Sequence, residues 1–303
     1  MRWLPWRRSQ AGATSAPGRS EDRRFAIRWG KRYLLGTPYV MPHDLDESRR
    51  LDFQHYLLRQ QMRGYYAAPL HAPQSILDVG CGTGIWPKEM ADIFPNATVI
   101  GCDLLTPPSD DPSLTGGIQI APPNYTFKAA NVLEGLPFGD RSFDFVHQRL
   151  LNSAIPTMQW SRVANELARV TRPGGWIELV ECDVAQGNGP GLEAIKQWIL
   201  AFCDRRGLNP ARQPSEYVAF LHNAGLTNIV ARRIDLPVGS AKGRNGQLAE
   251  ADFNALVTTF RPALIASGLA TEAEYDAAVS AMKDELAQRG TIWPFYIVYG
   301  QLG

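Results

Sequence analysis

Short apolar runs alternate with longer amphipathic stretches from residue 75 to the end of the chain. The apolar runs are rich in Val, Ile, Leu and Phe and are predicted to be strands at 75–79, 97–102, 125–129, 143–147, 176–180, 227–235 and 291–299. They lack regular polar alternation, which is typical of strands covered on both faces. The pattern therefore predicts an α/β protein with an open, mostly parallel sheet and right-handed crossovers.

The segments around these runs carry helical patterns. Helices are predicted at 46–63, 85–94, 159–170, 192–205, 215–224, 248–267 and 271–288. Asp44 or Asp46 is placed to cap the start of the first helix. The last two helices fall between the sixth and seventh strands, within about 237–290. We interpret this segment as a helical cap inserted over a functional site.

Residues 1–24 contain six arginines and two tryptophans but no apolar stretch long enough for a signal peptide or a membrane span. We predict a disordered basic tail over 1–24. A polar, aromatic-rich region with one helical pattern follows and is predicted to be an N-terminal helical extension over 25–72. The main α/β domain, with its cap insertion, is expected over 73–303.

The composition is that of an ordinary soluble globular protein, with 45% hydrophobic and 20% charged residues. A net charge of +1 lacks the basic excess of a broad nucleic-acid surface, and no run approaches 18 consecutive apolar residues. The four cysteines, Cys81, Cys102, Cys182 and Cys203, show no CxxC spacing, which argues against a disulfide scaffold or a zinc site. We expect a cytoplasmic monomer or homodimer that binds no nucleic acid, membrane or metal.

The segment DVGCGTG at 78–84 joins a predicted strand to a predicted helix. Its glycines let the backbone turn tightly and let a ligand approach closely, while the loop N–H groups face a negative group. In a parallel sheet, such crevices lie at the carboxyl ends of the strands. Asp103 follows the next strand, 19 residues after Gly84, where a carboxylate can accept hydrogen bonds from both hydroxyls of a ribose. The segment therefore predicts a site for a nucleoside that carries an anionic group.

Two ligand classes meet that description. One is a dinucleotide such as NAD, whose usual fingerprint is GxGxxG. The other is S-adenosyl-L-methionine, which has a ribose and a carboxylate but no phosphate. The spacing here is GxGxG with Asp78 directly before it. A carboxylate suits an ammonium and a sulfonium and is unfavourable beside a pyrophosphate, so Asp78 favours S-adenosyl-L-methionine.

These segments resemble the motifs of class I S-adenosylmethionine-dependent methyltransferases. ILDVGCGTG resembles their first motif, VIGCDL the second, FKAANVLEGLPF the loop after the third strand, DRSFDFV the fourth strand, and VTRPGGWIELVE the turn and fifth strand. YVMPHDLDESRRLDFQHYLLRQQMRG resembles the N-terminal helix of a subgroup that includes fungal regulators of secondary metabolism and bacterial small-molecule methyltransferases. The resemblance implies a Rossmann-like, doubly wound sheet of seven strands whose last strand is antiparallel.

The resemblance also implies which residues bind the methionine half of the cofactor. The loop glycines Gly80, Gly82 and Gly84 would line it, and Asp78 would face its ammonium group. Gln148, which follows the fourth strand, would reach the same end.

The adenosine half is assigned in the same way. Asp103 would hold the ribose and Leu104 would pack on the adenine, while Asn131 and Val132 would contact the adenine edge. Many relatives carry Asp at the place of Asn131, but the amide oxygen can still accept a hydrogen bond from an exocyclic amine.

The N-terminal region would close the pocket. Tyr39 and Gln54 are the residues we expect to contribute from it.

The sulfonium is already an activated methyl donor, so a general base is needed only when the acceptor atom is protonated. His147, Glu181 and Asp183 are candidate bases because they lie at strand ends that face the crevice. An imidazole pKa near 6.5 suits His147 to that role, although a strand-end histidine can equally be bonded to nearby backbone. The two acids can bind a polar acceptor or simply be solvated. His43 and His55 are interpreted as structural or surface residues.

Aromatic residues of the C-terminal half are candidates for an apolar acceptor pocket or for the core. They are Trp198, Phe202, Phe253, Phe260, Trp293 and Phe295. The chain lacks the Asn-Pro-Pro-Tyr or Asp-Pro-Pro-Tyr segment of methyltransferases that act on nucleobase amines, and His147-Gln148-Arg149 stands there instead. The leading hypothesis is a methyltransferase acting on a small, natural-product-like molecule. A regulatory or binding protein of the same fold and an NAD-dependent oxidoreductase are the alternatives.

Overall fold

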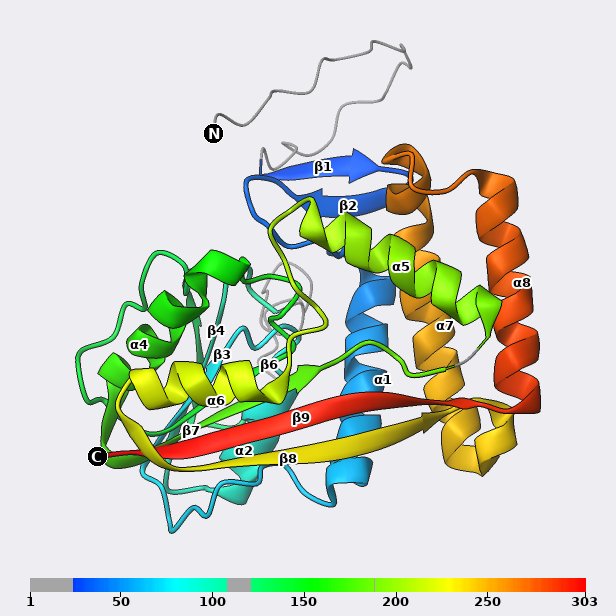
Figure 1. Cartoon of the computed structure of the whole chain (residues 1–303). Coiled ribbons are helices and arrows are strands. Elements are labelled where there is room, and N and C mark those ends of the chain that lie inside the picture. The colour runs from blue at the N-terminus through cyan, green and yellow to red at the C-terminus, as the bar shows by residue number, and fades with distance from the viewer. Residues whose placement is uncertain (1–23, 108–120, 188) are drawn as a thin grey trace.

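A seven-stranded sheet forms the centre of the computed structural model, which describes residues 24–107, 121–187 and 189–303. The predicted tail, apart from Arg24, lies outside the described residues. The strand order is β5-β4-β3-β6-β7-β9-β8, and Figure 1 labels these strands except β5. The strands are β3 (Ser75–Val79), β4 (Thr98–Asp103), β5 (Tyr125–Ala129), β6 (Phe143–Arg149), β7 (Thr171–Cys182), β8 (Leu226–Val238) and β9 (Thr291–Leu302).

Strand direction in the sheet follows the expected pattern. The pairs β3–β4, β3–β6, β4–β5 and β6–β7 are parallel, while β9 pairs antiparallel with both β7 and β8. The prediction of a mostly parallel, Rossmann-like sheet with an antiparallel last strand is confirmed. In this register Asp78 lies between Gly101 of β4 and His147 of β6, so the carboxyl ends of the three central strands meet at one edge.

Helices cover both faces of the sheet. They are α1 (Leu45–Met62), α2 (Ile85–Ile93), α4 (Trp160–Val170), α5 (Pro190–Asp204), α6 (Pro214–Asn223), α7 (Gly243–Ala266) and α8 (Glu272–Gln288). Short 3-10 turns, η2 (Thr157–Gln159) and η3 (Ser240–Lys242), precede α4 and α7. Buried side chains of α4 and α6 pack on one face of the sheet, and those of α2 pack on the other. The central strands are covered on both sides, as their uninterrupted apolar sequence predicts.

The N-terminal region begins with a β-hairpin rather than a helix. β1 (Phe25–Arg28) and β2 (Lys31–Leu34) pair antiparallel. The expected helical extension over 25–72 did not anticipate this hairpin, because two four-residue strands are too short for a distinctive pattern. The predicted helix follows as α1, and Asp44 caps it by accepting a hydrogen bond from the Glu47 N–H at 2.9 Å.

The cap helices α7 and α8 are inserted between the adjacent strands β8 and β9. Figure 1 shows these two strands running past the rest of the sheet to reach α7 and α8. One continuous apolar cluster joins α5, α7 and α8 to the distal ends of β8 and β9. The long strands thus fix the cap to the sheet, close to the carboxyl ends of the parallel strands.

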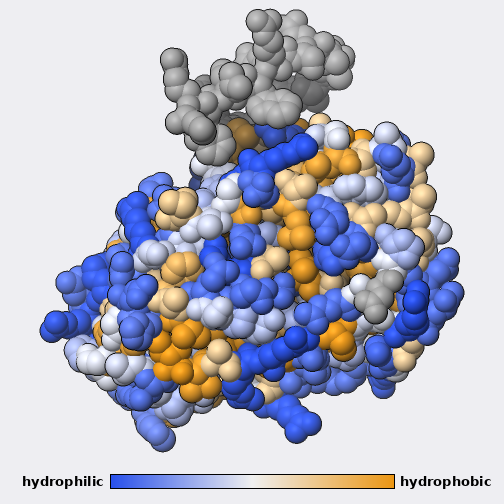
Figure 2. All heavy atoms as spheres, viewed as in Figure 1, coloured by the Kyte–Doolittle hydropathy of each residue, from blue (hydrophilic) through white to orange (hydrophobic). Residues whose placement is uncertain are grey.

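The face of the molecule seen in Figure 2 carries many hydrophilic side chains. Figure 2 shows hydrophobic side chains gathered in a few patches between hydrophilic ones on the face seen in Figure 1. Among the described residues, no helix combines the length and apolar character needed to cross a bilayer. Over the same residues, His, Cys, Asp and Glu side chains form no group suited to holding a metal ion.

Close packing of α5 on α8 predicts a position that does not tolerate a methyl group. A Cβ added to Gly191 would lie 2.4 Å from the backbone N of Met282 and 2.6 Å from the carbonyl O of Ala278. We expect Gly191→Ala to lower the free energy of unfolding by roughly 1–3 kcal/mol, because the overlap outweighs the gain of up to about 1 kcal/mol in helix propensity. Denaturant titration measures this change.

Gly64→Ala is the matched control, since a Cβ there has Tyr66 O at 3.7 Å as its nearest neighbour. Equal stability of the two variants would contradict the proposed α5–α8 contact.

Candidate functional site

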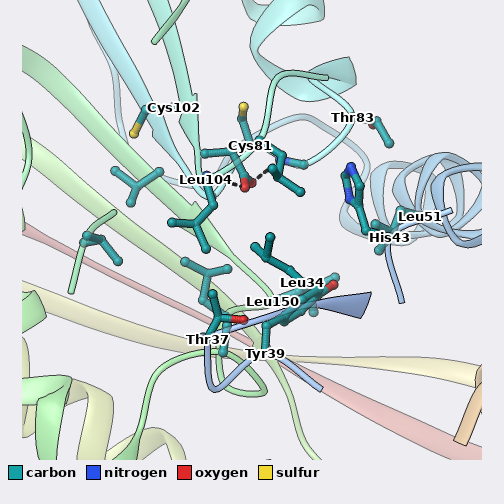
Figure 3. Close-up of a pocket in the computed structure, with 18 of the residues that line it drawn as sticks. Leu34, Thr37, Tyr39, His43, Leu51, Cys81, Thr83, Cys102, Leu104 and Leu150 are labelled. Carbon is teal, nitrogen blue, oxygen red and sulfur yellow. Dashed lines mark hydrogen bonds between the residues drawn. The ribbon is translucent and has the colours of Figure 1, made fainter. Parts of the chain in front are cut away.

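A cavity of about 370 Å³ lies at the carboxyl ends of β3, β4 and β6. This volume falls within the range of small-molecule sites. The glycine loop and the end of β4 form one side, and the chain from Leu34 to His55 forms the other. In Figure 3, Tyr39, Thr37 and Leu34 lie across the cavity from Cys81 and Leu104. The N-terminal region therefore closes over the sheet edge.

The glycine loop turns through left-handed backbone conformations. Gly80, Gly82 and Gly84 have φ angles of 72°, 56° and 75°. The N–H groups of Gly80 and Cys81 donate to the Cys102 carbonyl at 2.8 and 3.0 Å, which fixes the loop against β4. Gly80 and Gly82 line the cavity, whereas Gly84 is not among the lining residues and caps α2 instead.

Asp103 lies at the end of β4, and each of its carboxylate oxygens accepts a hydrogen bond from one backbone N–H. The Gly82 N–H donates to Oδ2 at 2.9 Å and the Leu104 N–H donates to Oδ1 at 2.6 Å. Burial raises the pKa of Asp103, while these N–H donors act in the opposite direction. Each carboxylate oxygen can accept further hydrogen bonds, so Asp103 is equipped to bind the two hydroxyls of a ribose.

The predicted adenine-binding residues also line the cavity. Leu104 presents its side chain there, and Asn131 and Val132 come from the loop after β5. Asn131 is fixed by a local turn, since its Oδ1 accepts from the Leu133 N–H at 3.1 Å and its Nδ2 donates to Glu134 at 2.9 Å. One lone pair of Oδ1 remains for an exocyclic amine.

Asp78 lines the cavity and His147 supports it from behind. The imidazole Nδ1 donates to Asp78 Oδ1 at 2.7 Å, and the ring stacks on Trp86 with 3.8 Å between centroids. His147 is 1% exposed and is not a lining residue. The geometry assigns His147 to orienting Asp78 and gives it no access to an acceptor. Among the described residues, no side chain donates a hydrogen bond to the other Asp78 oxygen, which is therefore available for an ammonium group.

Arg149 is a lining residue that sequence reasoning missed. Its guanidinium donates to His55 Nδ1 at 3.1 Å, and His55 Nε2 donates to Glu89 at 2.6 Å. Burial, then the charges of Arg149 and Arg59, lowers the pKa of His55 to about 3, so the ring is neutral and can accept from Arg149. Within the described part of the chain, no carboxylate forms an ion pair with Arg149.

A signal for Arg149 was present in the sequence. It follows the predicted fourth strand by two residues, and β6 in fact continues to Arg149. A buried guanidinium is costly without a partner anion, and it remains charged in proteins. The cavity thus presents a cation and the Asp78 carboxylate close together, which suits the carboxylate and ammonium of an amino acid.

Three other predicted residues do not turn toward this cavity. Gln148 is fully buried and lies beside Glu181. Glu181 accepts from the N–H groups of Leu151 and Asn152 at 2.9 and 3.0 Å, so it holds the chain after β6. Asp183 borders a second cavity, and its carboxylate accepts from the following N–H at 2.7 Å and from the Tyr296 hydroxyl at 3.4 Å.

The second cavity, of about 130 Å³, adjoins the first. Tyr39, Leu51, Gln54 and Leu150 line both. Leu150 has a φ of 59°, a left-handed conformation that costs a bulky residue about 1–3 kcal/mol and directs its side chain to this boundary. Tyr39 and Gln54, which we predicted to close the pocket, line the boundary between the two cavities.

Of the aromatic residues proposed for an acceptor pocket, half line this second cavity. Phe253, Phe260 and Trp293 are lining residues. Trp198, Phe202 and Phe295 instead pack within the apolar cluster of the cap. Periodicity could not separate the two groups, because the same helix face contributes to both the core and the cavity.

Helix α1 is joined to both sides of the site. The Thr83 hydroxyl of the glycine loop donates to Asp52 at 2.5 Å. On the cap side, Arg50 donates to Glu47 at 2.6 Å and to Asp252 of α7 at 3.1 Å, and the Gln54 amide donates to Asp252 at 3.0 Å. The glycine loop and the cap are therefore linked through one helix.

Comparison with known proteins matches this arrangement to a family. The profile of a methyltransferase domain matches residues 76–175. The secondary metabolism regulator LAE1 of Cochliobolus heterostrophus is 30% identical over 223 residues, covering 69% of this chain and 69% of its own length. This chain belongs to the class I S-adenosylmethionine-dependent methyltransferases. The methyltransferase pytC of Aspergillus terreus is 28% identical over 304 residues, covering 93% of this chain and 89% of pytC.

Other comparisons bear on length and fold. The chain spans about half the length of some curated relatives, 53% of the regulator laeA of Aspergillus fumigatus. The crystal structure of MccD protein matches with a TM-score of 0.50 at 14% identity, covering 82% of this chain and 96% of that one. That likeness supports the fold.

The cavity fits the cofactor of this methyltransferase family, S-adenosylmethionine. Asp103 provides acceptors for a ribose, while Asp78 and Arg149 provide opposite charges for an amino acid. A Cβ at Gly82 would meet no atom within 4 Å, so the loop leaves open space where a ligand approaches the backbone.

The burial of Glu181 predicts a dependence of stability on pH. Burial raises its pKa to about 8, so the folded methyltransferase holds a proton that the unfolded chain releases above about pH 4.3. Folding therefore binds a proton in this window, and stability falls as pH rises through it. We expect the free energy of unfolding to fall between pH 6 and pH 8 by on the order of 2 kcal/mol from this group.

Urea titrations at several pH values measure this slope. Glu181→Gln removes the titrating group and should have a flatter profile than the unmodified protein. Parallel profiles for the two proteins would show that Glu181 does not titrate in this range.

Proposed function

We propose that this protein transfers a methyl group from S-adenosylmethionine to a small-molecule acceptor. The observation that carries the proposal is the junction of two cavities. One presents the groups that suit the cofactor, and the other is largely apolar and is lined by the cap. Tyr39, Leu51, Gln54 and Leu150 form their common boundary, where an acceptor atom would meet the reactive methyl group.

The proposed cofactor contacts follow from the geometry. Asp103 binds the ribose hydroxyls, and Leu104 with Asn131 contacts the adenine. Asp78 binds the ammonium group, and Arg149, which forms no direct ion pair among the described residues, binds the carboxylate. Bound there, S-adenosylmethionine supplies a methyl group on a good leaving group.

The chain itself supplies orientation and exclusion of water. Holding two reactants in line contributes roughly 7–11 kcal/mol to such reactions. The N-terminal region closes the first cavity, while α5 and α7 close the second. The buried Arg50–Asp252 contact holds these two covers together.

A small acceptor is favoured over a macromolecule by the form of the second cavity. Its walls come from α1, α5, α7 and β9, and its apolar side chains suit a compact molecule. The likeness to pytC over most of both chains supports an enzyme. The likeness to LAE1 favours a second candidate, a regulatory protein that keeps the cofactor site.

Two substitutions test the proposed cofactor contacts. We expect Asp103→Ala to weaken binding of both S-adenosylhomocysteine and 5′-methylthioadenosine by about tenfold or more, because both ligands carry the ribose. Arg149→Gln should weaken S-adenosylhomocysteine by about 10- to 100-fold and leave 5′-methylthioadenosine unchanged, because the latter lacks the carboxylate. Isothermal titration calorimetry gives both dissociation constants.

Arg172→Gln is the matched control, because Arg172 pairs with Asp144 at the opposite end of the sheet. Equal weakening of both ligands by Arg149→Gln would show that Arg149 supports the fold rather than binding the carboxylate.

The function itself is tested with radiolabelled S-adenosylmethionine and a broad panel of small metabolites. Transfer of label to a panel member supports an enzyme. Stoichiometric cofactor binding without transfer would favour the regulatory candidate. Tight binding of NAD with no response to S-adenosylhomocysteine would contradict both.

A further inference from the structure

The second cavity has an apolar interior of limited width. Its apolar lining includes Leu51, Leu150, Phe253, Leu256, Phe260 and Trp293. Its volume of about 130 Å³ is close to that of engineered apolar cavities, on the order of 150 Å³, that hold one benzene molecule. The part of an acceptor that enters here is therefore apolar and about one ring wide.

The polar side chains around this cavity are nearly all engaged with one another. Arg50 binds Glu47 and Asp252, and the Gln54 amide donates to Asp252. The Asn152 amide donates to the Cys182 carbonyl at 2.7 Å.

The remaining charged groups at the rim are also engaged. Lys196 pairs with Glu193, one turn earlier on α5. The Asp183 carboxylate binds the Tyr296 hydroxyl and the Val184 N–H. Among the described residues, no imidazole lines this cavity, and its one lining carboxylate, Asp183, already accepts two hydrogen bonds.

Tyr39 provides the polar atom at the boundary. Its hydroxyl has no hydrogen bond to another described residue, and it lies within electrostatic reach of Glu47, Arg50 and Asp103. Burial, then the Glu47 carboxylate, raises the pKa of Tyr39, so the hydroxyl stays protonated and can donate or accept a hydrogen bond. It does not serve as a base.

The charge around the boundary is negative. Glu47 and Asp252 are two carboxylates that share the single guanidinium of Arg50. An excess of negative charge opposes an anionic acceptor and stabilises a positive charge that develops nearby.

These features distinguish the possible nucleophiles. A hydroxyl must lose a proton to a base during transfer, and a carboxylate would bring an anion beside the two acids. A neutral amine needs no base, because its lone pair attacks directly. The N–CH₃ bond forms as the CH₃–S bond breaks, the electron pair of that bond stays on sulfur, and the positive charge passes from sulfur to nitrogen.

We propose that the second cavity binds an uncharged amine on an apolar head about one ring wide, with the Tyr39 hydroxyl at the nitrogen and the Glu47–Arg50–Asp252 cluster facing the ammonium product. This inference rests on the proposed methyl transfer and specifies its substrate class.

Three fragments of matched shape test the proposal: 4-methylaniline, 4-methylphenol and 4-methylbenzoate. The first measurement is calorimetric binding of each to the full chain saturated with S-adenosylhomocysteine. We expect 4-methylaniline to bind at least tenfold more tightly than 4-methylbenzoate. Equal or tighter binding of the benzoate would overturn the charge argument.

A cavity-filling variant locates the binding. Leu256→Trp places an indole in the second cavity from a half-buried position of α7, and it should abolish fragment binding while leaving S-adenosylhomocysteine binding unchanged. Leu248→Trp, at a position of the same helix that is 37% exposed, is the control. Fragment binding that survives Leu256→Trp would overturn the assignment of the cavity.

The final measurement uses radiolabelled S-adenosylmethionine with the same fragments. Label in 4-methylaniline at a rate at least tenfold above the other two supports an amine acceptor. Label mainly in 4-methylphenol or 4-methylbenzoate would refute the amine while leaving methyl transfer intact. Failure of the proposed function would appear differently, as cofactor binding with no transfer to any member of the broad metabolite panel.

Discussion

The parallel pairing of β3 with β4 on one side and β6 on the other is the constraint on which the rest of this structure depends. It brings the glycine loop, Asp103 and Arg149 to one edge, although Gly80 and Arg149 are far apart in the chain. Hydrogen bonds from Gly80 and Cys81 to the Cys102 carbonyl, and from Gly82 to Asp103, then hold the loop against β4. Because both faces of these strands are buried, the register cannot slip without exposing apolar side chains.

The second organising element is α1, which the sheet does not fix by itself. It is held by polar contacts with the glycine loop at Thr83 and with the cap at Asp252. Its neutral His55 also orients Arg149. Polar contacts of this kind are directional, so they position side chains at the cavity more specifically than apolar packing does. One helix thereby relates the proposed cofactor cavity to the proposed acceptor cavity.

Several residues with catalytic chemistry act here as supports. His147 lies against Trp86 and binds Asp78, while Glu181 holds the two backbone N–H groups after β6. Their positions at strand ends made them candidate bases, but neither lines the cavities. A buried polar group must find a partner, and at a crowded sheet edge that partner is often the neighbouring backbone. The carboxylate that lines the second cavity, Asp183, is likewise hydrogen-bonded to a neighbouring N–H and to the Tyr296 hydroxyl, which favours an acceptor that needs no base.

The sequence by itself determined the seven strands and the main helices of the α/β sheet, because apolar periodicity, the glycine loop and the acid after the next strand are local patterns, but it did not determine the β1–β2 hairpin or the order of the strands. It also predicted Asp78, Gly80, Gly82 and Asp103 from the glycine loop and the strand ends, and Asn131 from the family resemblance, and all five line the first cavity. Only the tertiary structure decided which polar side chains face the cavities and which are buried and hydrogen-bonded to neighbouring residues. Arg149 lines the first cavity, whereas its neighbour Gln148 does not. In the same way, Phe253 lines the second cavity and Phe202 does not. The physical reason is that such a choice depends on partners distant in sequence: Glu89 and His55 orient Arg149, and Asp252 fixes Arg50 and Gln54.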